Sequence, residues 1–123
     1  MAKKYEKYII KKPKTVETLR YHKAKTGGYQ IYLDQSILPE SDMYVAIDYL
    51  KEIMHLERHT HDVSQIYIFL GAHAEIMLGD EKHDVTSSQD SPTVVFIPAG
   101  LEHSLKFTKR GLFIGLLRKA AYG

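Results

Sequence analysis

The chain has 123 residues and a mass of 14.1 kDa, which is enough for one domain with a single hydrophobic core. Its 44% hydrophobic content argues against a disordered chain, and the absence of cysteine excludes disulfides and thiolate zinc sites. The formal charge of +2 is too small to argue for nucleic-acid binding, and no apolar run is long enough to cross a bilayer. With no cysteine and no signal-peptide pattern, we expect a cytoplasmic protein.

The N-terminal segment is basic, with six lysines against the single glutamate Glu6 in its first fourteen residues. Such an arm is either a solvated terminus or a contact for an acidic partner or a nucleic acid, and we favour the solvated terminus. Tyr5, Tyr8 and Ile9 lie among the lysines. Part of the arm could therefore pack as a strand, on this chain or on a second subunit. We expect residues 1–40 to form N-terminal strands or an arm.

Short segments of strand composition follow, separated by turn signals rich in glycine, proline and serine. Several of them alternate between apolar and polar residues, as half-buried strands do. This spacing of short strands is typical of a β-sandwich or β-barrel. The expected strands are Gly28–Leu33, Gln65–Leu70, Ala74–Leu78, Thr93–Ile97, Leu101–Phe107 and Leu112–Leu117.

Asp42–Arg58 has two interpretations. Apolar residues recur there at helical spacing and Ser41 or Asp42 would make a good N-cap, so the local pattern predicts an amphipathic helix with His55 and His59 on one face. Yet the segment lacks the glutamate that a zincin helix has directly after its first histidine. The alternative is a strand over Tyr44–Tyr49 followed by a loop. The local sequence does not decide between the two.

Four side chains are candidate metal ligands. His59 and His61 are two residues apart, so a strand would present both imidazoles on one face. Gln65 could be the next side chain on that face after a short turn. His103 lies in an alternating apolar segment and is expected to point inward. A buried imidazole needs a partner, and a metal ion shared with two other histidines would provide one.

The pattern His59-x-His61-x-x-x-Gln65, followed downstream by Pro98-x-Gly100-x-x-His103, resembles the two motifs of the cupin superfamily. The resemblance covers about residues 43–117. It implies an all-β chain folded as a double-stranded β-helix, or jelly-roll, barrel, which would form a single domain over 1–123. It also favours strand and loop over helix for 42–58. The matching positions in cupins bind a metal inside the barrel.

The sequence also departs from the cupin pattern. Cupins usually have glutamate at the position of Gln65. At the positions where the cupin motifs open with glycine, this chain has Ile53 and Pro92. The asparagine often found four residues after the last histidine is Phe107. Without the glutamate, three neutral imidazoles and an amide leave the full +2 charge on the ion, which weakens metal binding and favours anionic ligands. Gln65 either ligates the metal through its oxygen or holds a bound water or substrate.

The resemblance implies one divalent transition metal (Fe, Mn, Ni or Zn), whose identity the ligand type does not determine. The expected function is that of a metal-dependent enzyme acting on a small, anionic organic molecule. A dioxygenase is favoured, with an isomerase or decarboxylase next. The alternative is a non-catalytic cupin that binds or senses a small molecule. The resemblance further implies a homodimer, and we expect neither nucleic acid nor membrane among the partners.

Other side chains have weaker signals. Aromatic residues that could line a substrate pocket, but that also commonly fill barrel interiors, are Tyr44, Tyr67, Phe69 and Phe107. No dedicated acid or base stands out, so the catalytic residues are unknown. Candidates by proximity to the motif alone are Glu57, Glu75, Asp48 and Tyr67. Histidines outside any motif, expected to be at the surface or hydrogen-bonded, are His22, His55, His73 and His83.

Overall fold

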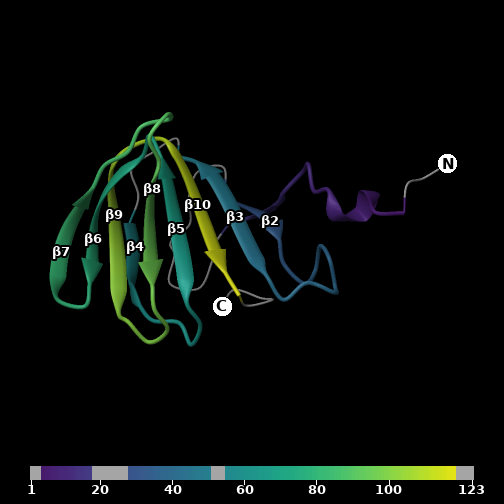
Figure 1. Ribbon diagram of the computed structural model, residues 1–123, viewed down its shortest axis with the longest axis horizontal. Coiled ribbons are helices and arrows are strands. Elements are labelled where there is room, and N and C mark those ends of the chain that lie inside the picture. The colour runs from purple at the N-terminus through teal and green to yellow at the C-terminus, as the bar shows by residue number, and fades with distance from the viewer. Residues whose placement is uncertain (1–3, 18–27, 51–54, 119–123) are drawn as a thin grey trace.

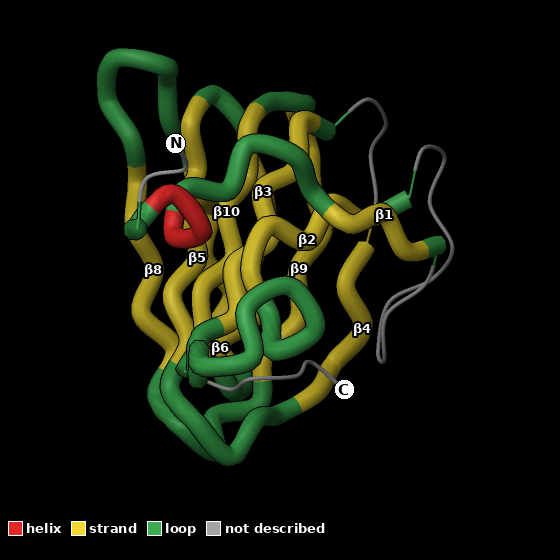
Figure 2. The backbone as a smooth tube through the Cα atoms, turned by 90° about the vertical axis from the view of Figure 1, so that its right-hand side faces the viewer, coloured by secondary structure: helices red, strands yellow, loops and turns green. Residues whose placement is uncertain are grey.

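The computed structural model describes residues 4–17, 28–50 and 55–118 of the chain (Figure 1). These residues are almost entirely strand and loop, and Figure 2 shows one short helical segment among them. In chain order the elements are η1, a 3-10 helix (Glu6–Tyr8), and the strands β1 (Lys14–Val16), β2 (Tyr29–Leu33), β3 (Tyr44–Tyr49), β4 (His55–His59), β5 (Gln65–Leu70), β6 (His73–Leu78), β7 (Glu81–Val85), β8 (Thr93–Ile97), β9 (His103–Lys109) and β10 (Leu112–Leu117). The described residues contain no helix long and apolar enough to span a membrane.

The strands form two antiparallel sheets. One has six strands in the order β1-β2-β3-β10-β5-β8, and the other has four in the order β4-β9-β6-β7. In Figure 1, β7 and β6 lie at one end of the molecule, and β2 and the N-terminal segment lie at the other. The all-β architecture expected from the sequence is confirmed.

The core lies between the inner faces of the two sheets. Along β5, the buried residues Gln65, Tyr67 and Phe69 alternate with half-buried ones, so every second side chain points inward. Phe69 from one sheet and Phe107 from the other are fully buried, with ring centroids 6.1 Å apart. Truncating a buried phenylalanine to alanine typically costs about 3–5 kcal/mol. These rings therefore contribute strongly to holding the sheets together.

Most of the expected strands are present. Gln65–Leu70, Thr93–Ile97 and Leu112–Leu117 have the expected bounds. The strand expected to begin at Leu101 begins at His103 instead. The reason is that the preceding turn extends further, since the Leu101 amide donates a hydrogen bond to the Pro98 carbonyl at 3.2 Å.

The described part of Asp42–Arg58, the segment with two interpretations, contains two strands and no helix. Tyr44–Tyr49 is the strand β3, so the helical interpretation is wrong there, because pairing with β10 and β2 overrides the local periodicity. The loop expected to follow is also wrong in part: His55–His59 is the strand β4. Residues 51–54, including Ile53, lie outside the described residues.

The N-terminal segment pairs within its own chain. β1 lies antiparallel to β2, with Thr15 opposite Gln30. The segment before it contains η1, in which Lys7 forms an ion pair with Glu40 at 3.2 Å. Tyr5 and Ile9 stay 64% and 65% exposed. The N-terminal segment thus contains one strand, but not at Tyr5, Tyr8 and Ile9, which precede it and lie mostly in solvent.

Asp34 links β1 to the turn that follows β2 through hydrogen bonds to both segments. Its carboxylate accepts hydrogen bonds from the Ser36 amide and hydroxyl at 2.9 and 2.6 Å, and from the Ile37 amide at 3.2 Å. It also accepts one from Lys14 Nζ of β1 at 2.7 Å. Burial alone would raise the pKa of Asp34, but the hydrogen bonds from Lys14 and Ser36 outweigh it and hold this pKa below its usual 3.8.

We predict that Asp34→Ala lowers the free energy of unfolding by about 1–3 kcal/mol at pH 7, because it removes a charged acceptor from several donors. Since the pKa of Asp34 is lowered in the folded state, its stabilisation is present above pH 3.8 and is lost as the pH falls through the folded value. The difference between wild type and variant in urea unfolding should therefore shrink in acid. Asp90→Ala, at an exposed loop position, should change stability by less than about 0.5 kcal/mol.

Candidate metal centre

A β-bulge in β4 turns His59 into the barrel. Leu56 pairs with Leu105 of β9, and His59 pairs with His103, so three steps along β4 match two along β9. Regular alternation from the buried Leu56 would send Arg58 inward and His59 outward. The extra residue reverses this, and Arg58 is exposed while His59 is only 5% exposed.

The structure brings His59, His61 and His103 together. Their potential ligand atoms all lie within 4.8 Å of one another, and all three side chains are buried. The ring centroid of His59 lies 4.3 Å from that of His103 and 4.8 Å from that of His61. His61 lies beyond the end of β4, not within a strand, yet it is buried while Thr60 is exposed. The spacing of two residues thus puts both imidazoles on one side of the chain, as expected.

The turn before β9 is fixed to the histidine segment by two contacts. The Gly100 amide donates a hydrogen bond to the His61 carbonyl at 2.8 Å, and Gly100 adopts a φ of +83° that favours glycine. On the outside, Arg58 Nε donates to the Glu102 carboxylate at 2.6 Å. The proline–glycine turn therefore positions His61 relative to His103.

Backbone carbonyls fix the tautomers of two of the histidines. His103 Nδ1 lies 2.9 Å from the Leu101 carbonyl oxygen, and His59 Nδ1 makes a short contact with the Glu57 carbonyl oxygen. Because a carbonyl only accepts, each Nδ1 carries the proton and each Nε2 keeps a lone pair for a metal. These carbonyls are functional groups that motif matching missed, since side-chain identity gives no signal for them.

The histidines are suited to the neutral form that metal binding needs. Burial lowers the pKa of His59 and of His103 below the usual 6.5, and it outweighs the opposing effect of their carbonyl partners. His103 Nε2 is buried and has no hydrogen-bond partner among the described residues. A neutral imidazole with a buried lone pair is what a divalent transition ion requires, so the residues fit such an ion.

Gln65 is the first residue of β5. It lies on the inner face of this strand and is only 4% exposed. Its Oε1 is buried without a hydrogen-bond partner in the described part of the chain. Leaving a buried amide oxygen unsatisfied is costly, so a ligand for this oxygen would stabilise the site. The burial and the unsatisfied oxygen of Gln65 are compatible with both roles expected for it, as a metal ligand or as a hydrogen-bonding residue.

The four candidate pocket residues differ in position. The Tyr67 ring lies 6.1 Å from the His103 ring, edge to face. Phe69 and Phe107 pack in the central core and are completely buried. Tyr44 belongs to a second cluster with Tyr29, Ile31 and Leu117. Tyr67 is therefore a candidate that the structure brings into ring contact with one of the histidines, His103.

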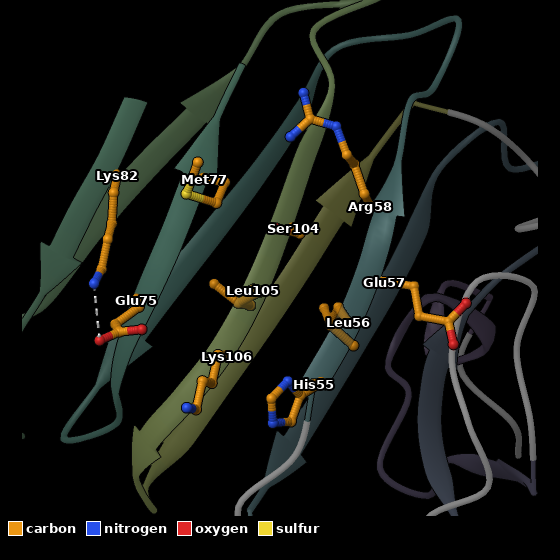
Figure 3. A pocket seen from close by; sticks show the side chains of 10 residues that line it. All are labelled: His55, Leu56, Glu57, Arg58, Glu75, Met77, Lys82, Ser104, Leu105 and Lys106. Atoms are coloured by element: carbon orange, nitrogen blue, oxygen red, sulfur yellow. Dashed lines mark ion pairs between the residues drawn. The ribbon is translucent and has the colours of Figure 1, made fainter. Parts of the chain in front are cut away.

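Two acid–base candidates lie outside the barrel. A surface groove of about 440 Å³ runs over the four-stranded sheet, and Glu57 and Glu75 are among its lining residues (Figure 3). Glu75 forms an ion pair there with Lys82 at 3.5 Å. Asp48 is buried in β3, where its Oδ1 accepts a hydrogen bond from the Gln30 amide. Glu57 and Glu75 were acid–base candidates because they are close to the motif in sequence. The structure places them on the outer face of the sheet, whereas the bulge turns His59 to the inner face.

The remaining histidines behave as expected where the structure describes them. His55 and His83 are exposed, and His83 Nε2 lies 3.0 Å from Glu81. His73 Nε2 lies 3.1 Å from the Ser87 carbonyl oxygen. None of these three belongs to the candidate metal-binding cluster of His59, His61 and His103. His22 lies outside the described residues.

The arrangement of strands resembles that of solved cupins. A cupin superfamily protein from Desulfitobacterium hafniense aligns with a TM-score of 0.54 and 16% identity, over 63% of this chain and 67% of that one. An RmlC-like cupin from Shewanella frigidimarina aligns with a TM-score of 0.60 and 11% identity, over 93% and 86% of the two chains. The chain has the cupin fold.

A third cupin-fold neighbour is a predicted oxalate decarboxylase from Thermotoga maritima, with a TM-score of 0.59 and 15% identity over 90% of this chain and 98% of that one. At these identities the likeness concerns the fold. No family model matches the sequence. A search of curated proteins finds no match either. The double-stranded β-helix expected from the two motifs is thus confirmed by structure rather than by sequence similarity.

We predict that untagged protein carries about one equivalent of Fe, Mn, Ni or Zn, and that a His59→Ala, His103→Ala double variant loses it, because two of three imidazole ligands are removed. Elemental analysis of the purified proteins measures this directly. A His55→Ala, His83→Ala variant removes two exposed histidines outside the cluster and should keep its metal. Wild-type protein that neither holds nor takes up any of these ions would contradict the prediction.

Proposed function

We propose that the protein is a metal-dependent enzyme of the cupin fold that acts on a small, anionic organic molecule, with dioxygenase chemistry as the reaction class. The observation that supports this most directly is the cluster of His59, His61 and His103, whose ligand atoms lie within 4.8 Å of one another. Among the described residues no carboxylate or thiolate belongs to this cluster. It therefore has the composition of a centre built from neutral ligands.

Charge is the basis for the choice of substrate class. Burial favours the neutral form of His59 and His103, and the amide of Gln65 is neutral at any pH of interest. A divalent ion held by such ligands keeps its full charge in a partly desolvated site. A carboxylate, enolate or thiolate would neutralise that charge, so we propose that a substrate of this class binds at the open positions.

The chain's own residues would position the substrate. The carbonyls of Glu57 and Leu101 hold two imidazoles in fixed orientation, so little reorganisation is needed when the site is loaded. The Tyr67 ring lies 6.1 Å from the His103 ring and offers an aromatic surface beside the centre. Gln65 Oε1 is a buried acceptor on β5 without a hydrogen-bond partner among the described residues, which a substrate donor or a bound water could use. The buried surroundings exclude bulk water from these groups.

When bound, the metal would supply Lewis acidity and, if it is iron, the means to activate O₂. Isomerisation and decarboxylation are the next reaction classes, because they use similar centres. The name of the Thermotoga neighbour points to a small dicarboxylate for that protein, which is consistent with an anionic substrate here. A non-catalytic protein that only binds or senses such an anion is the alternative.

We predict that the Fe(II)-loaded protein consumes O₂ in the presence of one member of a panel of β-diketones, thiols and small carboxylates, and that the His59→Ala, His103→Ala variant does not. An oxygen electrode, with product analysis by mass spectrometry, measures turnover. Oxalate is included to test decarboxylation through CO₂ release. Thermal stabilisation by a panel member without any turnover would support the binding or sensing alternative and contradict the enzymatic proposal.

We further predict that Gln65→Glu lowers the Kd for Zn²⁺ by about tenfold or more and weakens binding of anionic panel members, because the new carboxylate takes up part of the ion's charge. The metal-free variant should be less stable than wild type, since it buries an uncompensated carboxylate. Competition with a zinc-binding dye and calorimetry measure the two affinities. Gln89→Glu, at an exposed loop position, should leave both unchanged. Unchanged anion affinity in Gln65→Glu would contradict the charge argument while leaving the metal centre intact.

A further inference from the structure

Two short segments of the same construction carry two of the three candidate ligands. Each has a residue whose backbone carbonyl contacts an imidazole, then a charged residue, then the histidine itself. They are Glu57-Arg58-His59 in β4 and Leu101-Glu102-His103, which ends on the first residue of β9. In both segments the carbonyl oxygen of the first residue faces Nδ1 of the third. The charged residue therefore lies between the two groups that together define the orientation of each imidazole.

The two charged residues are joined to each other outside the barrel. Arg58 Nε and Nη2 lie 2.6 and 2.5 Å from the same oxygen of Glu102, Oε2. Figure 3 shows Arg58 extending from β4 over the outer face of the four-stranded sheet. The imidazoles of His59 and His103 are buried on the other side. The ion pair thus connects the two ligand segments from behind, without contact with the space between the imidazoles.

A third segment, the turn between β6 and β7, belongs to the same network. Arg58 Nη1 donates a hydrogen bond to the Gly79 carbonyl at 3.2 Å, and the Gly79 amide donates one to the Glu102 carbonyl at 2.8 Å. Gly79 directly follows Leu78, which pairs with His103 between β6 and β9. The start of β9 is therefore restrained from both of its neighbouring strands, and the guanidinium is the group common to these restraints.

The exposure of the ion pair limits what it contributes to stability. The Arg58 and Glu102 side chains are 48% and 54% exposed, and ion pairs in water contribute little to the free energy of unfolding. Metal binding is more sensitive to position, because a divalent ion needs its imidazole nitrogens at about 2.0–2.1 Å. The rings of His59 and His103 lie only 4.3 Å apart, on two different strands. A small shift of one segment against the other would therefore change the spacing of two ligands.

We propose that Arg58 is a positioning residue of the metal centre. Its ion pair with Glu102 holds the two ligand segments at the separation at which His59 and His103 share one ion. The inference rests on the metal-dependent function proposed above, and it adds to that function a residue that touches neither the ion nor an imidazole.

Reversing the charges separates positioning from direct electrostatics. By Coulomb attraction alone, a negative charge near the centre strengthens the binding of a cation and a positive charge weakens it. Arg58→Glu and Glu102→Arg would then change the metal affinity in opposite directions. If the ion pair positions the ligands, both substitutions weaken metal binding, because each places like charges on the two segments and separates them.

The test is the Kd of the full chain for Zn²⁺, measured by competition with a zinc-binding dye. Arg58→Glu and Glu102→Arg should each raise this Kd about tenfold, the lower end of the 10–100-fold effect of groups that orient metal ligands. The Arg58→Glu, Glu102→Arg double variant restores opposite charges, so its Kd should return to within about threefold of the wild-type value. The visible absorption bands of the Co²⁺ form, which depend on coordination geometry, should change in both single variants and recover in the double variant.

Arg118→Glu is the matched control, because Arg118 forms a comparable exposed ion pair with Asp42 at 2.9 Å that involves neither ligand segment. It should leave the Kd and the Co²⁺ spectrum unchanged. Thermal melting of the metal-free proteins establishes that each variant is folded at the temperature of the titration. Wild-type affinity in both single variants, opposite effects of the two, or a double variant as weak as the singles would overturn the proposal while leaving the metal centre intact. A wild type that takes up no metal would overturn the centre and this inference with it.

Discussion

The candidate centre depends on the antiparallel pairing of β4 with β9 and on the bulge within it. Pairing sets His59 directly opposite His103, and the bulge decides that both imidazoles point into the barrel. Without the extra residue, burial of Leu56 would require Arg58 to point inward, and a guanidinium would be desolvated in place of an imidazole. With it, Arg58 stays outside and binds Glu102 of the adjacent turn. One local irregularity thus turns the His59 imidazole inward and also fixes the segment that precedes His103.

Desolvation and hydrogen bonding act together on the histidines. Burial disfavours the charged imidazolium, and the backbone carbonyls at Nδ1 leave the lone pair on Nε2. The barrel interior therefore maintains neutral ligands in one tautomer, and the backbone does so without any further polar side chain. The described cluster contains no acidic group. The charge of a divalent ion bound there would therefore not be neutralised by these side chains. The same low polarity would leave the charge of a divalent ion bound there largely unscreened.

Strand composition between turn residues was a reliable guide to β5 and β10, whose sequences are almost entirely apolar. It failed for β7, in which four of the five residues are exposed. That strand forms because β6 offers it a pairing edge, which its own sequence does not reveal. It was also ambiguous over Tyr44–Tyr49, where apolar residues satisfy helical and strand periods at once. Pairing of β3 with two neighbouring strands resolved that ambiguity.

The sequence by itself determined the all-β class, most of the strands, and the identity of the three histidines, because ligand chemistry and turn residues are local properties. The two motifs were sufficient to predict that His59, His61 and His103 meet, although some forty residues separate the first from the last. Only the tertiary structure decided which face each side chain occupies. A shift of one residue in a strand moves each side chain to the other face of the sheet. The bulge that turns His59 inward while Glu57 stays exposed forms only where β4 pairs with β9. The carbonyl partners that set the tautomers, likewise, exist only once the backbone is folded.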